Sequence, residues 1–308
     1  MAIAATSALG QLDAQEGTIA KPAEKTADFS DVRATGEMQT VADGFAFTEG
    51  PARDPAGGFF FTDIPNTTIH RVDVDGNVLV FTEDSKHANG LMVGSNGKLY
   101  ACQMDGQVVV YDRDTGESKI LASQYEGKRF NAPNDLVLDT DGGIYFTDPQ
   151  YRAPEPLPQG MRAVYYIAAD GQVSRVTDEL PAPNGIGLSP DGTRLYVAPS
   201  MSAEMLVYEV KGPGKLGPKQ VFCKLKQKAG ESDGGSDGIT LDLGGNVYFT
   251  TAMGIEVVSP EGNTITIIEV PQKPANVTFA GEDRKTMIIT ARSGVYAVPM
   301  SVAGLPPN

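Results

Sequence analysis

Six polar residues recur at matching places in a repeated phrase, each just ahead of an apolar run. They are Glu49, Asn89, Asn134, Asn184, Asp237 and Asn276. All six side chains carry an oxygen that can bind a hard cation, and two of them are carboxylates. If the fold gathers these residues, the carboxylates would repel one another and lose solvation unless a divalent cation lay between them. The residue types therefore predict a metal site.

The choice of metal follows from the ligand chemistry. Oxygen ligands alone favour Ca²⁺ first, with Mg²⁺ or Mn²⁺ as alternatives. Zn²⁺ could occupy the site, but the His and Cys ligands that it prefers are absent from these positions. A competing interpretation is that the Asn-Gly and Asp-Gly pairs only form turns. Their recurrence at one repeat position favours the metal hypothesis.

The repeat itself predicts the elements that must position these side chains. Successive polar residues are 40, 45, 50, 53 and 39 residues apart. Each repeat reads as two hairpins, and Asp75-Gly76 and Asp170-Gly171 mark two of the turns. Four strands in about 45 residues is the size of a propeller blade. We predict an all-β fold, a six-bladed β-propeller with four-stranded antiparallel blades over residues 37–308.

In such a ring the first strand of each blade lines the central channel, so the six polar residues would converge at one end of it. The last repeat lacks an outer strand. We expect residues 37–45, EMQTVADGF, to supply that strand and so to close the ring. Residues 1–36 are predicted to be a flexible tail, whose first 16 residues are either a signal remnant or an irregular start.

Composition excludes several classes of function. The formal net charge of −14 would repel a phosphate backbone, so no nucleic-acid partner is expected. No apolar run is long enough for a membrane span. Cys102 and Cys223 are too few for a Cys-based zinc site and read as buried thiols, although one disulfide between them stays open. Oligomeric state is not predicted, and localisation stays open between periplasmic or secreted and cytoplasmic.

The repeated phrases also resemble a known family. FTEGPARDPAGGFFFTD, RFNAPNDLVLDTDGGIYFTDP, PAPNGIGLSPDGTRLYV, GSDGITLDLGGNVYFTT and PANVTFAGEDRKTMIITA are similar to the senescence-marker-protein/gluconolactonase (regucalcin-like) family, and the resemblance covers about residues 38–300. It implies a six-bladed propeller that hydrolyses a small sugar lactone, such as gluconolactone, with one divalent metal ion, often calcium.

The resemblance also implies roles for individual residues. Glu49, Asn134, Asn184 and Asp237 match the metal ligands, and Asp237 would also be the catalytic proton acceptor. Arg129 matches approximately an arginine that holds the substrate, although two extra residues separate it from Asn134. His87, Asn89, Gln103 and Tyr151 are predicted to be substrate-binding residues of the pocket wall from their positions alone.

Two alternative functions stay open. The chain could be a non-enzymatic calcium-binding propeller that serves as a platform, or a paraoxonase-like lactonase or esterase with His87 as a base. The pattern G-x-S-x-G at residues 234–238 would need a strand–turn–helix context, but a strand-like run follows it. The Pro-rich insertion at residues 151–162 is either a surface loop or a lid over the pocket.

Overall fold

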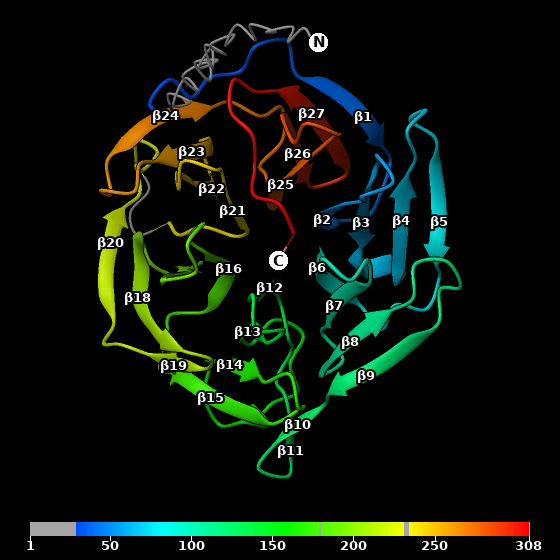
Figure 1. The fold of residues 1–308 in the computed structure, drawn as a ribbon, viewed down its shortest axis with the longest axis vertical. Coiled ribbons are helices and arrows are strands. Elements are labelled where there is room, and N and C mark those ends of the chain that lie inside the picture. The colour runs from blue at the N-terminus through cyan, green and yellow to red at the C-terminus, as the bar shows by residue number, and fades with distance from the viewer. Residues whose placement is uncertain (1–28, 179, 231–233, 308) are drawn as a thin grey trace, which may run out of the picture.

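The computed structural model describes residues 29–178, 180–230 and 234–307, and these form a ring of β-sheets around a central channel. Six antiparallel sheets radiate from the channel like blades (Figure 1). Five sheets have four strands, and the fourth blade carries one additional short strand. The predicted six-bladed β-propeller is therefore confirmed. Of the predicted tail, residues 1–28 lie outside the described residues.

The strands follow one another from the channel outward in every blade. The first blade contains β2 (Thr48–Arg53), β3 (Phe59–Asp63), β4 (Thr68–Val72) and β5 (Val78–Thr82), and the second contains β6 (Ala88–Val93), β7 (Leu99–Gln103), β8 (Gln107–Tyr111) and β9 (Ser118–Ala122). The third contains β12 (Leu136–Leu138), β13 (Ile144–Asp148), β14 (Ala163–Ile167) and β15 (Val173–Asp178), and the fourth contains β16 (Pro183–Leu188), β17 (Arg194–Pro199), β18 (Glu204–Gly212) and β20 (Gln220–Lys224), with β19 (Lys215–Leu216) also beside β18. The fifth contains β21 (Ile239–Leu241), β22 (Val247–Thr251), β23 (Gly254–Val258) and β24 (Thr264–Ile268), and the sixth contains β25 (Asn276–Ala280), β26 (Thr286–Ala291), β27 (Gly294–Pro299) and β1 (Gln39–Asp43). A hairpin of β10 (Gln124–Tyr125) and β11 (Lys128–Arg129) and a 3₁₀ turn at Ile64–Asn66 complete the elements.

The ring closes as the sequence predicts. Strand β1 pairs antiparallel with β27, and Asp43 lies opposite Gly294. This pairing joins residues more than 250 positions apart and covers the edge of β27, so that the last blade has four strands like most of the others. Ahead of β1, Val32 is buried against the last two blades and Ala34 forms a bridge with Met300.

The hydrophobic core lies between neighbouring blades. One cluster combines Cys102 and Val108 of the second blade with Leu136, Phe146 and Tyr165 of the third. Further clusters repeat the arrangement around the ring. A fully buried large apolar side chain contributes about 1.5 to 3 kcal/mol, so these clusters hold the blades together. Both cysteines are buried free thiols.

Hydrogen bonds between blades fix the inner strands at one end of the channel. Three threonines, each near the end of a second strand, donate to a carbonyl of the next blade: Thr62 to Asn89 (3.2 Å), Thr147 to Asn184 (2.8 Å) and Thr250 to Ala275 (3.0 Å). Backbone groups add to them, since the Gly90 N–H donates to the Asn134 carbonyl at 2.7 Å. A Cβ at Gly90 would lie 2.3 Å from Asp135 Oδ1, so the approach requires glycine.

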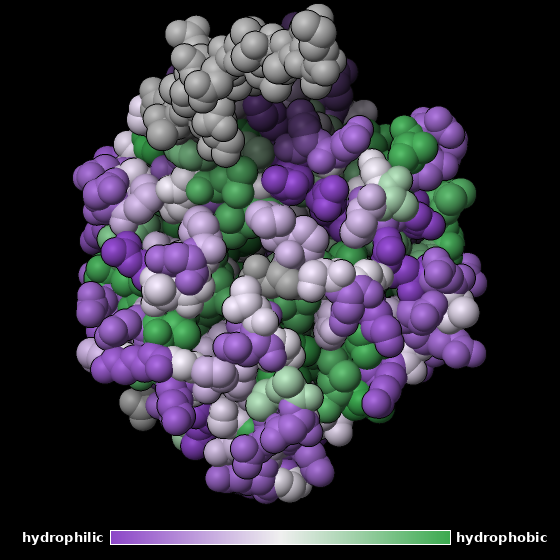
Figure 2. Space-filling view, in the orientation of Figure 1, coloured by the Kyte–Doolittle hydropathy of each residue, from purple (hydrophilic) through white to green (hydrophobic). Residues whose placement is uncertain are grey.

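The opposite end of the channel is apolar. A cavity of about 120 Å³ there is lined by the ends of the inner strands, among them Val93, Leu188 and Leu241, and by Leu305–Pro307. Figure 2 shows that side chains close the centre of this face and that its rim is predominantly hydrophilic. No helix in the described ranges is long and apolar enough to cross a membrane.

Candidate active site

The residues that lead the six repeats gather at the channel end remote from Leu305–Pro307. Glu49, Asn89 and Asn184 are each the second residue of an inner strand, Asn276 is the first residue of β25, and Asn134 and Asp237 come two residues before β12 and β21. All except Asp237 are buried. Asp237 is partly exposed, so it is the member of the six that a dissolved substrate can reach.

Carboxylates crowd this end of the channel. Burial raises the pKa of Glu49 well above its usual range, and the negative charge of Asp237 raises it further. Burial also raises the pKa of Asp237 to about 6, although a hydrogen bond from Asn184 and the positive charges of Lys273 and Arg292 oppose the rise. In the absence of a cation, both acids therefore keep their protons to a higher pH than a free carboxyl group does.

A third carboxylate belongs to the cluster, and the sequence analysis missed it. Asp135 is buried, and burial raises its pKa to about 7. Its Oδ1 accepts from the Leu136 N–H at 2.9 Å, and Asn276 Nδ2 lies 3.4 Å from its Oδ2. The sequence contained a signal for Asp135, because it directly follows Asn134, but only Asn134 occupies the position that recurs in the repeats.

Two amide oxygens of the cluster have no partner. Asn89 Oδ1 and Asn184 Oδ1 are buried and accept no hydrogen bond from the described residues. A buried acceptor without a donor is costly, and a bound cation would satisfy it. The described residues contain no metal-binding group of three or more His, Cys, Asp or Glu, so a site here draws on amide oxygens as well. The unpartnered oxygens and crowded carboxylates fit a hard divalent cation.

The Pro-rich insertion reaches two neighbouring blades. At its start, the Tyr151 hydroxyl hydrogen bonds to the Ser200 hydroxyl of the fourth blade. Arg152, which has a φ of 61°, reaches His87 of the second blade. The negative charge of Asp237 contributes to the raised pKa of Tyr151, so this hydroxyl lies near the acidic cluster. The beginning of the insertion thus forms part of the pocket mouth.

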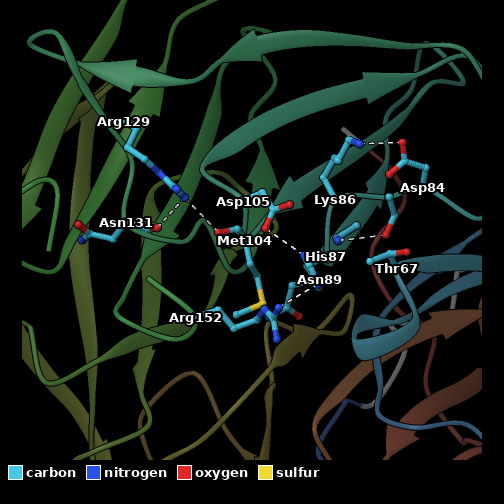
Figure 3. Close-up of polar contacts among 12 residues, drawn as sticks. Thr67, Asp84, Lys86, His87, Asn89, Met104, Asp105, Arg129, Asn131 and Arg152 are labelled. Atoms are coloured by element: carbon cyan, nitrogen blue, oxygen red, sulfur yellow. Dashed lines mark hydrogen bonds and ion pairs between the residues drawn. The ribbon is translucent and has the colours of Figure 1, made fainter. Parts of the chain in front are cut away.

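His87 is held from both sides (Figure 3). Its Nδ1 lies 3.0 Å from Asp105 Oδ1, and its Nε2 lies 2.9 Å from the Arg152 guanidinium. Because a guanidinium can only donate, Nε2 must accept and Nδ1 must carry the proton. The Nε2 lone pair is thus occupied, which leaves no free base at His87 in this arrangement.

Comparison with known proteins identifies the family of this chain. The family described as the SMP-30/Gluconolactonase/LRE-like region matches residues 47–293, from the inner strand of the first blade to β26 of the last. The chain belongs to this family. A gluconolactonase of Zymomonas mobilis is 28% identical over 87% of this chain and 82% of its own length.

The chain is also similar to an enzyme named for a different reaction and to a solved structure. A diisopropyl-fluorophosphatase of Loligo vulgaris is 27% identical over 79% of this chain and 84% of its own length. The solved structure of XC5397 from Xanthomonas campestris, described as a gluconolactonase, superposes with a TM-score of 0.79 at 28% identity. That superposition covers 86% of this chain and 89% of the other.

Two residues that were predicted from the resemblance or from position lie in other surroundings. Arg129 donates to the carbonyl oxygens of Phe130 at 3.0 Å and Asn131 at 3.2 Å, and it contacts none of the six converging residues (Figure 3). Gln103 is buried, and its amide donates to the Tyr111 hydroxyl at 3.0 Å. Arg129 Nη1 makes no hydrogen bond with the described residues, so a substrate role for Arg129 stays a prediction.

An apolar wall borders the cluster on the side of the first three blades. It consists of Ile64, Met104 and Ala132, with Phe47, Tyr151 and Ala153 packed against them. Met104 adjoins the cluster, because Asn89 Nδ2 lies 3.9 Å from its sulfur. The Arg292 guanidinium lies 5.5 Å from the Phe47 ring centroid. The partly exposed members of this wall, Phe47, Tyr151 and Ala153, can pack against the carbon face of a small ring.

Proposed function

We propose that this protein hydrolyses a small sugar lactone, gluconolactone in the first instance, at one divalent cation bound by Glu49, Asn134, Asn184 and Asp237. Ca²⁺ is the first choice of cation because all of these donors are oxygens. The observation that carries the proposal is the buried group of carboxylates with two unpartnered amide oxygens beside it. The gluconolactonase relatives support lactone hydrolysis as the reaction.

The accessibility and charge of each residue determine the role that we assign to it. A bound divalent cation would polarise the lactone carbonyl and lower the pKa of a water molecule beside it. Asp237 is partly exposed, so its carboxylate can accept the proton of the attacking water. The water oxygen bonds to the carbonyl carbon, the ring C–O bond breaks, and Asp237 returns the proton to the leaving oxygen. Glu49 is buried and supplies charge rather than proton transfer.

The surroundings orient the substrate. The apolar wall would cover one face of the lactone ring, and the bond between the Tyr151 and Ser200 hydroxyls holds Tyr151 of that wall in place. Asn134 has a buried side chain beside Asp135 and would supply a further amide oxygen to the cation. Two carboxylate ligands would neutralise a doubly charged ion.

The test is hydrolysis of a panel of sugar, aliphatic and aryl lactones, corrected for the uncatalysed rate. Protein stripped with EDTA should be inactive, and Ca²⁺, Mg²⁺, Mn²⁺ or Zn²⁺ restored singly should identify the metal. Asp237→Asn should lower kcat by about 10²- to 10⁴-fold. Asp141→Asn removes an exposed carboxylate from a turn and serves as the matched control.

Two results would contradict the proposal. Undiminished hydrolysis by EDTA-stripped protein would rule out the metal. Failure to hydrolyse any lactone with any of the four ions would rule out the reaction and would favour the platform interpretation.

A further inference from the structure

A second cavity opens beside Asp237, on the side of the fourth, fifth and sixth blades. It has a volume of about 130 Å³. The described residues that line it are Ser200, Lys226, Gln227, Lys228, Gly234, Gly235, Ser236, Asp237, Thr250, Thr251, Ala252 and Lys273. Ser200 and Asp237 connect it to the candidate active site, since one contacts Tyr151 and the other belongs to the acidic cluster. The cavity is thus continuous with the proposed catalytic centre.

The neutral side-chain donors of this lining are already engaged. Each hydroxyl donates to a backbone carbonyl, and the amide of Gln227 does the same. The bonds run from Ser200 to Ala182 (3.2 Å), Ser236 to Gly238 (3.4 Å), Thr250 to Ala275 (3.0 Å), Thr251 to Gly254 (3.0 Å) and Gln227 to Gly234 (3.0 Å). These groups hold the wall in place and leave little hydrogen-bonding capacity for a neutral polyhydroxyl ligand.

The three lysines are different. None of the ammonium groups of Lys226, Lys228 and Lys273 forms an ion pair or a hydrogen bond with the described residues. All three side chains belong to exposed residues, so each ammonium can swing over the cavity. Among the described lining residues, Asp237 is the one carboxylate, and the cation proposed above would engage it. Three positive charges that have no partner among the described residues lie around one cavity, which favours an anion there.

The placement is informative because the rest of the protein is acidic. The chain carries a formal charge of −14, and three carboxylates gather at the neighbouring channel end. An anionic substrate would be repelled by such a surface unless positive charge lay along its approach. A neutral lactone would gain nothing from the lysines. Lysine is also a flexible point charge, so it can bind phosphate, sulfonate or carboxylate without a fixed bidentate geometry.

We propose that the lactone substrate carries an anionic substituent, which Lys226, Lys228 and Lys273 bind while the ester group lies at Asp237. This inference rests on the proposed function, because it names the class of lactone that the same site accepts. The three lysines and Asp237 line the same cavity, so one ligand can reach both. The apolar wall on the other side of the mouth then contacts the uncharged part of the ring.

The experiment compares four lactones on the metal-loaded protein. They are neutral glucono-1,5-lactone, its 6-phosphate, the 6-deoxy-6-sulfonate, and glucaro-1,4-lactone with a free carboxylate. The variants are Lys273→Met, the double variant Lys226→Met/Lys228→Met, and the triple variant. The matched control is Lys98→Met/Lys285→Met, which removes two exposed lysines from outside the cavity.

We expect kcat/KM for at least one anionic lactone to exceed that for the neutral lactone about tenfold or more. The triple variant should lose about tenfold or more on that substrate through KM, while its rate on the neutral lactone and its unfolding temperature stay the same. The preference should weaken as salt is raised. The phosphate, sulfonate and carboxylate arms identify the anion.

Two outcomes overturn the inference, and they differ in what they leave standing. If the wild type hydrolyses neutral and anionic lactones equally, and the lysine variants treat them alike, the inference fails and the proposed function survives. If the control variant loses the preference as strongly as the triple variant, the effect is one of overall charge and the lysine site is wrong. If the protein hydrolyses none of the four lactones with any metal, both the inference and the proposed function are wrong.

Discussion

Replacing Asp135 by asparagine should stabilise the metal-free protein, because this buried carboxyl is held in an unfavourable environment. Its pKa rises from an ordinary 3.8 to about 7. That difference corresponds to about 4 kcal/mol of opposition to folding once the group is fully ionised. The Leu136 N–H, which donates to Oδ1 at 2.9 Å, can still donate to the asparagine oxygen. We therefore expect a gain of about 2 to 4 kcal/mol at pH 8 in EDTA.

The sign of the pH dependence follows from the direction of the pKa change. A carboxyl whose pKa is higher in the folded state than in the unfolded state costs nothing below about pH 4. The cost grows as the pH rises and is complete just above the folded pKa of about 7. The gain from Asp135→Asn should therefore fall below about 2 kcal/mol at pH 5.

Bound metal should reduce the stability advantage of Asp135→Asn over the wild type. A cation that binds only the folded wild type stabilises it by mass action, and loss of a neighbouring negative charge weakens that binding. Asp135→Asn should then be more stable than wild type in EDTA and gain less from millimolar Ca²⁺. Urea unfolding at pH 5 and pH 8, with EDTA or Ca²⁺, measures all four values.

The exposed residue Asp141 provides the control, since Asp141→Asn should change stability by less than about 0.5 kcal/mol in every condition. A destabilisation by Asp135→Asn in EDTA that is equal at both pH values would refute the reasoning. It would show that Asp135 is a structural hydrogen-bond acceptor and carries no electrostatic strain.

Three further predictions concern the frame of the site. Thr147→Val removes a 2.8 Å hydrogen bond to the Asn184 carbonyl and should lower the free energy of unfolding in urea by about 1 to 3 kcal/mol. Thr147→Ser keeps the hydroxyl and should be nearly neutral. Equal losses in the two variants would show that the hydrogen bond does not stabilise the protein. In Gly238→Ala the new Cβ would lie 2.0 Å from Asn276 Oδ1, so the variant should lose about 1 to 3 kcal/mol of unfolding free energy. It should also lose most of the rise in unfolding temperature that Ca²⁺ causes in the wild type. An unchanged rise would place the cation elsewhere. Truncation before Gly44 removes β1, so β27 becomes a free edge; the protein should aggregate in size-exclusion chromatography, and a peptide of residues 37–45 should restore it, unless the ring is stable without that strand.

Much of the frame could be predicted because it depends on local pattern. The Asp75-Gly76 and Asp170-Gly171 turns lie between paired strands, β4 with β5 and β14 with β15. Repetition then fixed the number of blades, and a missing outer strand pointed to residues 37–45. Each of these inferences needs only turn chemistry and alternation along a short stretch of chain.

The parts that could not be predicted depend on side-chain direction across blades. Asp135 entered the acidic cluster because its neighbour's repeat position brought both residues inward. Arg129 turned to nearby carbonyls, since the β10–β11 hairpin places its guanidinium over Gly106 and Met104. The lysines of the cavity come from loops 45 or more residues apart, so no local pattern connects Lys228 with Lys273.

The order in which the chain is made adds a constraint on when this protein can become active. Residues of the acidic end come from the first blade to the last, and β1 must meet β27, which is more than 250 positions away. A nascent chain therefore holds the early carboxylates without their later partners until the later blades are made. The ring cannot close until β27 has left the ribosome. Prematurely terminated products should accordingly be inert rather than partly active.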